Sequence, residues 1–163
     1  MRGRILPYIY SLSALSDLRF NITLWTAVIA WAAAQLIKTA LEYSRTKKIN
    51  YSLLFGTGGM PSSHCAFVSA MTTAVGIRNG FDSSVFALCC VFSMVVMYDA
   101  AGVRRAAGQQ AEIINQLVEA IENSGIKMDR KLKELLGHSP IEVAAGAVLG
   151  IVAAVIAARL MGA

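Results

Sequence analysis

Apolar residues form four long runs that lack charged side chains: Asn21 to Ile37, Ile49 to Ile77, Ser83 to Tyr98 and Val143 to Ala158. Three of them are 16 or 17 residues long. Because roughly 20 residues cross a bilayer as a helix, flanking polar residues or a thinned bilayer must complete these spans. The pattern predicts an all-α integral membrane helical bundle with about four transmembrane helices; a soluble all-α core is the alternative.

An amphipathic helical insert is predicted at residues 104–137, between the third and fourth spans. Its first helix ends at Ser124-Gly125, and a shorter amphipathic piece covers Asp129 to Leu136. Packing on the bundle or on the membrane explains both pieces better than a chemical role. The apolar stripe of the first helix consists of Ile113, Ile114, Leu117, Val118 and Ile121.

The 163 residues are expected to form a single domain, with residues 1–20 as an interfacial segment, because Pro7 and Asp17 interrupt any signal-peptide core. Apolar residues make up 56% of the chain and charged residues 15%, which also indicates a membrane protein. Membrane lipids are the expected partners and nucleic acid is not, while a homo-oligomer is left open. The cysteines, Cys65, Cys89 and Cys90, have no metal-ligand spacing, so no disulfide framework, metal or cofactor is expected.

A glycine-rich turn, Gly58-Gly59-Met60-Pro61, precedes Ser62-Ser63-His64. Small hydroxyl residues at the start of an apolar helix, with unpaired backbone N–H groups, suit an anion. His64 adds an imidazole that can titrate near neutral pH. The alternative is that a serine only caps the helix and His64 is an interfacial polar residue.

Basic residues stand near the ends of the first and third spans. Lys38 and Arg45 are seven residues apart and share a helix face. A Lys38–Glu42 ion pair, or extension of Lys38 to the interface, would also explain this lysine. Arg104 and Arg105 could grip phosphate oxygens or anchor the helix to headgroups.

His138 precedes the last span and is followed by Ser139-Pro140-Ile141-Glu142. Ser139 and Glu142 fit a capping box with Pro140 at the first helical position, which explains those residues but not His138. A carboxylate one turn later can orient the ring and keep one nitrogen unprotonated, as an imidazole nucleophile requires.

An even number of spans brings these groups to one membrane face, because the loops after the first and third spans share a side. Of the 15 Lys and Arg residues, ten fall on that side of the membrane and five on the other. Without the four candidate phosphate ligands, the count on that side is six. This excess favours an active site on the cytoplasmic face, in a bacterial cytoplasmic membrane. The converging groups are Lys38, Arg45, the turn at residues 62–64, Arg104, Arg105, His138 and Glu142.

These motifs resemble the superfamily of type 2 phosphatidic acid phosphatases, which includes bacterial acid phosphatases and vanadium haloperoxidases. The family pattern is Lys-x6-Arg-Pro, Pro-Ser-Gly-His and Ser-Arg-x5-His-x3-Asp. This chain has Lys38-x6-Arg45, Pro61-Ser62-Ser63-His64 and His138-x3-Glu142. It is most similar to the divergent branch with Gly-Gly-Met-Pro-Ser-Ser-His and Tyr-Asp-Ala-x-Gly-Val-Arg-Arg, from about Lys38 to Gly150.

The chain departs from the family pattern in four places. Thr46 replaces the proline of the first motif, Glu142 replaces aspartate, and no serine precedes Arg104. The insert puts 32 residues between Arg105 and His138 where five are usual. Either arginine can therefore be the phosphate ligand only if the insert folds out and back.

The resemblance implies metal-independent hydrolysis of a lipid phosphate. His138 would attack phosphorus to form a phosphohistidine, Glu142 would orient it, and His64 would protonate the leaving alkoxide. The substrate would be phosphatidylglycerophosphate, phosphatidic acid or a polyprenyl diphosphate. An inactive phospholipid- or phosphate-binding scaffold is the alternative, and the small membrane-embedded form disfavours a haloperoxidase. The implied phosphate-binding groups are Lys38, Arg45, Gly59, Ser62, Ser63 and one of Arg104 and Arg105.

Overall fold

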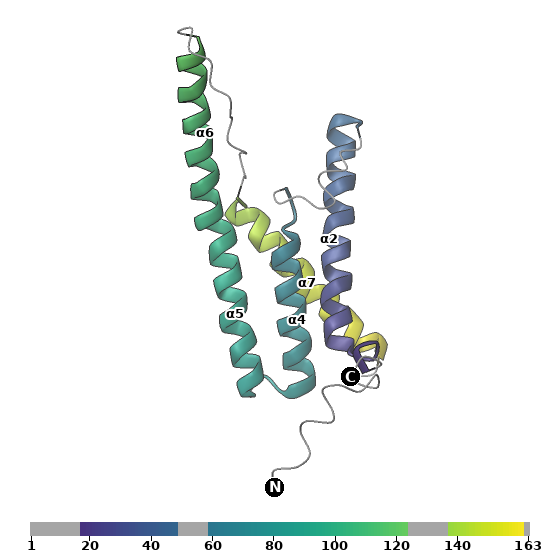
Figure 1. The fold of residues 1–163 in the computed structure, drawn as a ribbon. Helices are drawn as coiled ribbons and strands as arrows, with labels where there is room; N and C mark the ends of the chain where they lie inside the picture. Colours follow the sequence, from purple (N-terminus) through teal and green to yellow (C-terminus); the bar gives the residue numbers. More distant parts are fainter. Residues whose placement is uncertain (1–16, 49–58, 124–136, 162–163) are drawn as a thin grey trace.

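A computed structural model describes residues 17–48, 59–123 and 137–161 of the chain. All regular elements in these ranges are helices, so the predicted all-α fold is confirmed (Figure 1). The expectations for residues 1–16 and for Asp129 to Leu136 lie outside the described ranges. The helices are α2 (Ile22–Thr46), α4 (Ser63–Asn79), α5 (Ser84–Ala101), α6 (Val103–Glu122) and α7 (Pro140–Met161).

Short polar side chains fix where four of the helices begin. The side chains of Asn21, Ser62 and Ser83 accept hydrogen bonds from the first turns of α2, α4 and α5. At the start of α7, Ser139 and Glu142 form the predicted capping box, in which each side chain accepts a backbone N–H of the other residue. These caps satisfy N–H groups that would otherwise lack partners at the helix ends.

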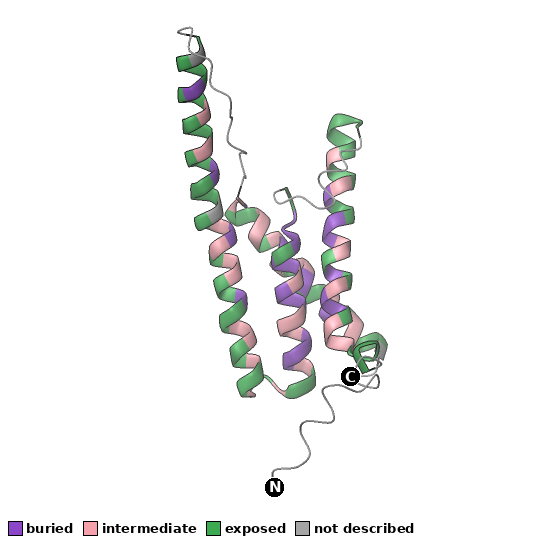
Figure 2. Ribbon diagram, in the orientation of Figure 1, coloured by how far each residue is buried: buried purple, intermediate pink, exposed green. Residues whose placement is uncertain are grey.

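Helix α4 is the centre of the bundle and packs against α2, α5 and α7. Its many buried residues are visible along its length in Figure 2. The helix of the second apolar run begins at Ser63, well after Ile49, and residues 49–58 lie outside the described ranges. Cys65, Ala66 and Ala70 are fully buried, because small side chains let the neighbouring helices approach closely.

Two glycines four residues apart allow α7 to cross directly over α4. A Cβ atom on Gly146 would lie 2.3 Å from the carbonyl oxygen of Ser62, and one on Gly150 would lie 2.3 Å from that of Ala66. Backbone thus packs on backbone here, the small-residue packing that holds membrane helices together. This contact fixes the start of α7 beside the start of α4.

We expect Gly150→Leu to destabilise the bundle, because the new side chain meets the backbone of α4. Overpacking lowers the free energy of unfolding by about 1–3 kcal/mol. The melting temperature should therefore fall by several degrees. The measurement is thermal unfolding in detergent micelles. Val148→Leu is the matched control, since Val148 is 60% exposed on the same helix; equal melting temperatures for the two variants would contradict the close crossing.

Three helical segments are long and apolar enough to cross a membrane: Ile22–Thr46, Ser84–Ile121 and Pro140–Leu160. Helix α4 has 17 residues and is surrounded by the others. The chain is therefore an integral membrane protein in contact with lipid, while the count of four spans stays a prediction. Large apolar side chains that face outward include Trp25, Ile29, Leu36, Leu88, Phe92, Met94, Ile151 and Ile156.

Helix α6 continues α5 beyond the bundle, with Gly102 at the junction (Figure 1). The helical part of the insert therefore begins at Val103 and extends the third apolar helix. Among the described helices α6 packs only against α5, so its predicted packing on the bundle is not observed. Ile113 and Leu117 of its apolar stripe are 58% and 59% exposed.

Candidate functional site

Two backbone hydrogen bonds bring separate motifs together at one end of the bundle. The N–H of Ser62 donates to the carbonyl oxygen of Glu142 at 3.0 Å, which joins the starts of α4 and α7. The N–H of His138 donates to the carbonyl oxygen of Ala100 at 3.0 Å, so the chain returns to the end of α5 after the insert. The second and third motifs therefore meet although they are far apart in sequence.

The His138 ring is held by the carboxylate one turn along the chain. Its Nδ1 lies 3.0 Å from Oε2 of Glu142, and the same oxygen accepts the Ser139 N–H at 3.1 Å. Since a carboxylate only accepts hydrogen bonds, Nδ1 is the donor in this contact, and Nε2 is not part of it. The His138 residue is 3% exposed, so its surroundings hold it in a defined position.

His64 lies beside His138. The two ring centroids are 6.5 Å apart and the rings are tilted by 58°. A near-attack contact of about 3–3.5 Å and a hydrogen bond of about 2.8 Å would let both rings act on one phosphoryl group. His64 is exposed in the first turn of α4, whereas His138 is buried.

Lys38 is a buried cation about two turns before the end of α2. The residue is 3% exposed, and its Nζ has no hydrogen-bond partner among the described residues. Neither a Lys38–Glu42 ion pair nor extension to the interface therefore accounts for it. An ammonium group buried without a partner is costly unless an anion neutralises it.

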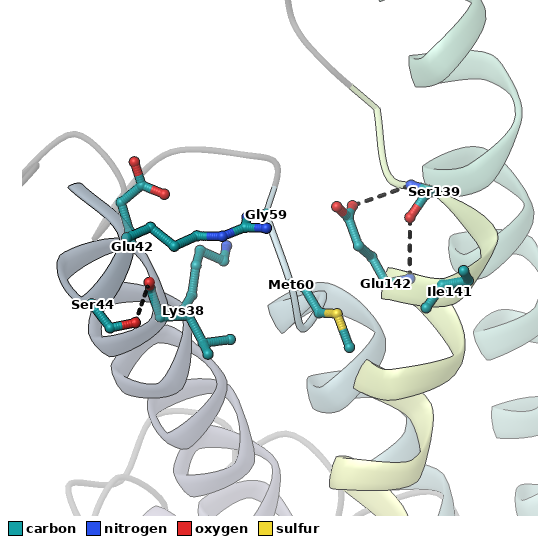
Figure 3. A pocket seen from close by; sticks show the side chains of 10 residues that line it. Lys38, Glu42, Ser44, Gly59, Met60, Ser139, Ile141 and Glu142 are labelled. Carbon is teal, nitrogen blue, oxygen red and sulfur yellow. Dashed lines mark hydrogen bonds between the residues drawn. The ribbon is translucent and has the colours of Figure 1, made fainter.

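The position of Lys38 depends on Gly59. This glycine has φ +82°, and a Cβ there would lie 3.2 Å from Cγ of Lys38. Glycine thus provides both the left-handed backbone and the space for the lysine stem. Figure 3 shows Lys38 on α2 and Glu142 on α7 facing the same cavity from opposite sides.

This first cavity has a volume of about 560 Å³. Arg45 lines it together with Lys38, as their shared helix face predicts. Leu41, Met60 and Ile141 form an apolar part of its wall, and all three are strongly exposed. The remaining lining residues are Glu42, Ser44, Gly59, Ser139 and Glu142.

A second cavity of about 370 Å³ lies on the side of α6. It shares Gly59, Ser139 and Glu142 with the first cavity, so the two are adjacent. Arg105 lines it, whereas nothing is described of the Arg104 side chain. Gly137, Gln109 and Glu112 complete its lining.

The two serines of the second motif line neither cavity. Ser62 is fully buried, and its Oγ accepts the N–H of Cys65 at 3.4 Å. Ser63 is 2% exposed. Helix capping accounts for Ser62, and the structure brings the side chains of Lys38, Arg45 and Arg105, but not those of the serines, to the cavities.

Sequence reasoning did not single out Gln109 and Glu112. Together with Arg105 they occupy positions i, i+4 and i+7, which share one helix face. That spacing was a usable signal once Arg105 was a candidate ligand. The described part of the chain brings together no three His, Cys, Asp or Glu side chains that could hold a metal ion.

The fold and site define a helical membrane protein in which His64 and His138 lie side by side. Neither histidine lines the two cavities, but Glu142, which contacts the His138 ring, lines both. The chain belongs to the Divergent PAP2 family, whose model matches residues 20–153. It is also 42% identical over 149 residues to the Uncharacterized membrane protein YuiD of Bacillus subtilis (strain 168), over 83% of this chain and 92% of that protein. No solved structure matches the chain significantly.

Proposed function

We propose that the protein is a metal-independent lipid-phosphate phosphatase that works through a phosphohistidine. The observation that carries the proposal is the pairing of His138, held by Glu142 with Nε2 available, with His64 at a centroid distance of 6.5 Å. Membership of the Divergent PAP2 family agrees with this chemistry. A nucleophile oriented by one group and assisted by a nearby acid is the usual arrangement for covalent catalysis.

In the first step, Nε2 of His138 attacks phosphorus and the bond from phosphorus to the leaving oxygen breaks. His64 donates its proton to that oxygen, so the alcohol departs neutral. Glu142 holds the Nδ1 proton and stabilises the positive charge that develops on the ring. The 3.0 Å contact between His138 Nδ1 and Glu142 Oε2 supports this role.

In the second step, water attacks the phosphohistidine. His64, now unprotonated, accepts a proton from the water, and the phosphorus–nitrogen bond breaks. Inorganic phosphate leaves and the His138 lone pair is restored. The same two rings therefore serve both halves of the reaction.

Lys38 and Arg45, in the first cavity, are the proposed ligands of the phosphoryl oxygens. Arg105 is a further proposed ligand and lines the second cavity, which shares Gly59, Ser139 and Glu142 with the first. The Lys38 ammonium supports this assignment most directly. It is attracted by the Glu142 carboxylate but has no hydrogen-bond partner among the described residues, so a phosphoryl oxygen could supply one. Arg45 and Arg105 can each donate two hydrogen bonds to an oxyanion. The protein thus supplies positive charge where the transition state needs it.

A lipid substrate fits the location of the first cavity. Leu41, Met60 and Ile141 offer an apolar wall at the end of helices that can span a membrane. A headgroup can enter this site while the acyl or prenyl chains stay in the bilayer. We propose that the site lies on the cytoplasmic face of a bacterial membrane, because basic residues are in excess on that side.

Phosphate release by the purified full-length protein in nanodiscs tests the proposal. We expect release from phosphatidylglycerophosphate, phosphatidic acid or a polyprenyl diphosphate in the presence of EDTA, because Lys and Arg provide the positive charge. Loss of release on chelation, restored by magnesium, would rule the mechanism out. Binding of phosphate or vanadate with no release from any of the three lipids would favour the inactive scaffold.

A further inference from the structure

The second cavity carries a feature that phosphate binding does not explain. Glu112 places a carboxylate in it, close to groups proposed to bind an anion. A carboxylate repels phosphate oxygens, so it weakens an anion site unless it contacts another part of the ligand. The structure gives Glu112 no ion pair with another described residue.

Three side chains of α6 meet this cavity from one face of the helix. Arg105, Gln109 and Glu112 follow one another at single-turn intervals, and all three are exposed. Arg105 repels a cationic group and Glu112 repels an anionic one. The middle residue, Gln109, both donates and accepts hydrogen bonds.

A neutral hydroxyl group satisfies all three residues at once. It can donate its proton to the Glu112 carboxylate and accept a hydrogen bond from Arg105, and the Gln109 amide can do either. Glu142 also lines this cavity, but its carboxylate already contacts His138 and the Ser139 N–H. On the α6 side, Glu112 would repel a second phosphate and Arg105 would repel an ammonium group. A group without polar atoms would make no hydrogen bond to any of these three side chains.

The second cavity adjoins the proposed reaction site. It shares Ser139 and Glu142 with the first cavity, and Glu142 holds the His138 ring. A group bound to the scissile phosphate can therefore extend into the second cavity while the phosphate remains beside His138. Binding of that group in the second cavity would therefore help to position the phosphate for reaction.

We propose that Arg105, Gln109 and Glu112 form a subsite for an uncharged hydroxyl on the alcohol that carries the scissile phosphate. This inference rests on the proposed function and narrows its substrate class to phosphate monoesters of hydroxylated alcohols. Phosphatidylglycerophosphate has a free hydroxyl beside its terminal phosphate, whereas phosphatidic acid and polyprenyl diphosphates do not.

Glycerol 3-phosphate and propyl phosphate are the probes, because they differ in the hydroxyls and share the phosphate and the carbon chain length. Equilibrium binding is measured by calorimetry on full-length His138→Ala protein in nanodiscs, which prevents turnover. We expect glycerol 3-phosphate to bind roughly tenfold more tightly, as hydrogen bonds to charged groups imply. Adding Glu112→Gln should reduce that preference several-fold and leave the affinity for propyl phosphate equal or improved.

Glu119→Gln is the matched control. It removes the same charge from an exposed residue of α6 that lines neither cavity, and it should keep the preference. Equal binding of the two probes to the parent protein, binding of neither, or an unchanged preference in Glu112→Gln would overturn the subsite. If the wild-type protein releases no phosphate but the preference exists and depends on Glu112, the phosphatase proposal fails and the subsite stands.

Discussion

His138→Ala is expected to abolish phosphate release, with a loss of about 10³-fold or more, because removing a nucleophile removes the covalent pathway. The measurement is the first-turnover rate of phosphate ester cleavage, together with acid-labile labelling of the protein by radioactive phosphate. Both signals should vanish with an alkyl phosphate and with p-nitrophenyl phosphate alike. Retained labelling in His138→Ala would place the nucleophile elsewhere.

His64→Ala and Glu142→Gln separate the roles around that nucleophile. The p-nitrophenolate group leaves without needing a proton, so His64→Ala should impair its first cleavage much less than that of an alkyl phosphate. Glu142→Gln should leave a residual rate, since the amide can still contact the ring but cannot balance its charge. Equal losses for both substrates in His64→Ala would contradict its assignment as the general acid.

Lys38→Met is expected to reduce phosphate release by roughly 10²- to 10³-fold, the usual effect of removing one group that stabilises a transition-state oxyanion. The same substitution should leave the melting temperature unchanged or higher. A buried ammonium without a hydrogen-bond partner destabilises the free protein, and methionine fills a similar volume without that cost. Release assays and thermal unfolding on one preparation measure both effects.

Lys48→Met is the control, since Lys48 is exposed just beyond the end of α2. It should change neither activity nor stability appreciably. Wild-type activity in Lys38→Met would move the anion site away from α2. A large fall in melting temperature would instead make Lys38 a structural residue.

Hydropathy alone predicted the helical class and most helix positions, because burying backbone polar groups in lipid leaves few alternatives to helices. An uncharged run does not show where backbone hydrogen bonding starts, so hydropathy alone did not predict that α4 begins only at Ser63. The glycine-rich turn before Ser62 and Ser63 did indicate a helix start there, and the structure confirms it. The continuation of α5 into α6 was also missed. The insert was predicted to carry a helix of its own, and in the structure Gly102 joins that helix to α5 in nearly the same direction.

The candidate site was predictable where residue spacing determines geometry. Lys38 and Arg45 share a helix face, and the capping box of Ser139 and Glu142 follows from adjacent positions. The proximity of His64 and His138 required a tertiary contact, which spacing along the chain cannot supply. Family resemblance, rather than residue periodicity, provided that pairing.

The bonds from Ser62 to Glu142 and from His138 to Ala100 connect the ends of three helices. Each of the two histidines is therefore placed by a helix other than its own. Under the proposed mechanism, a chain in which α7 has not docked would have one imidazole and no positioned nucleophile. Hydrolysis would then require the complete bundle, because no single helix carries the site.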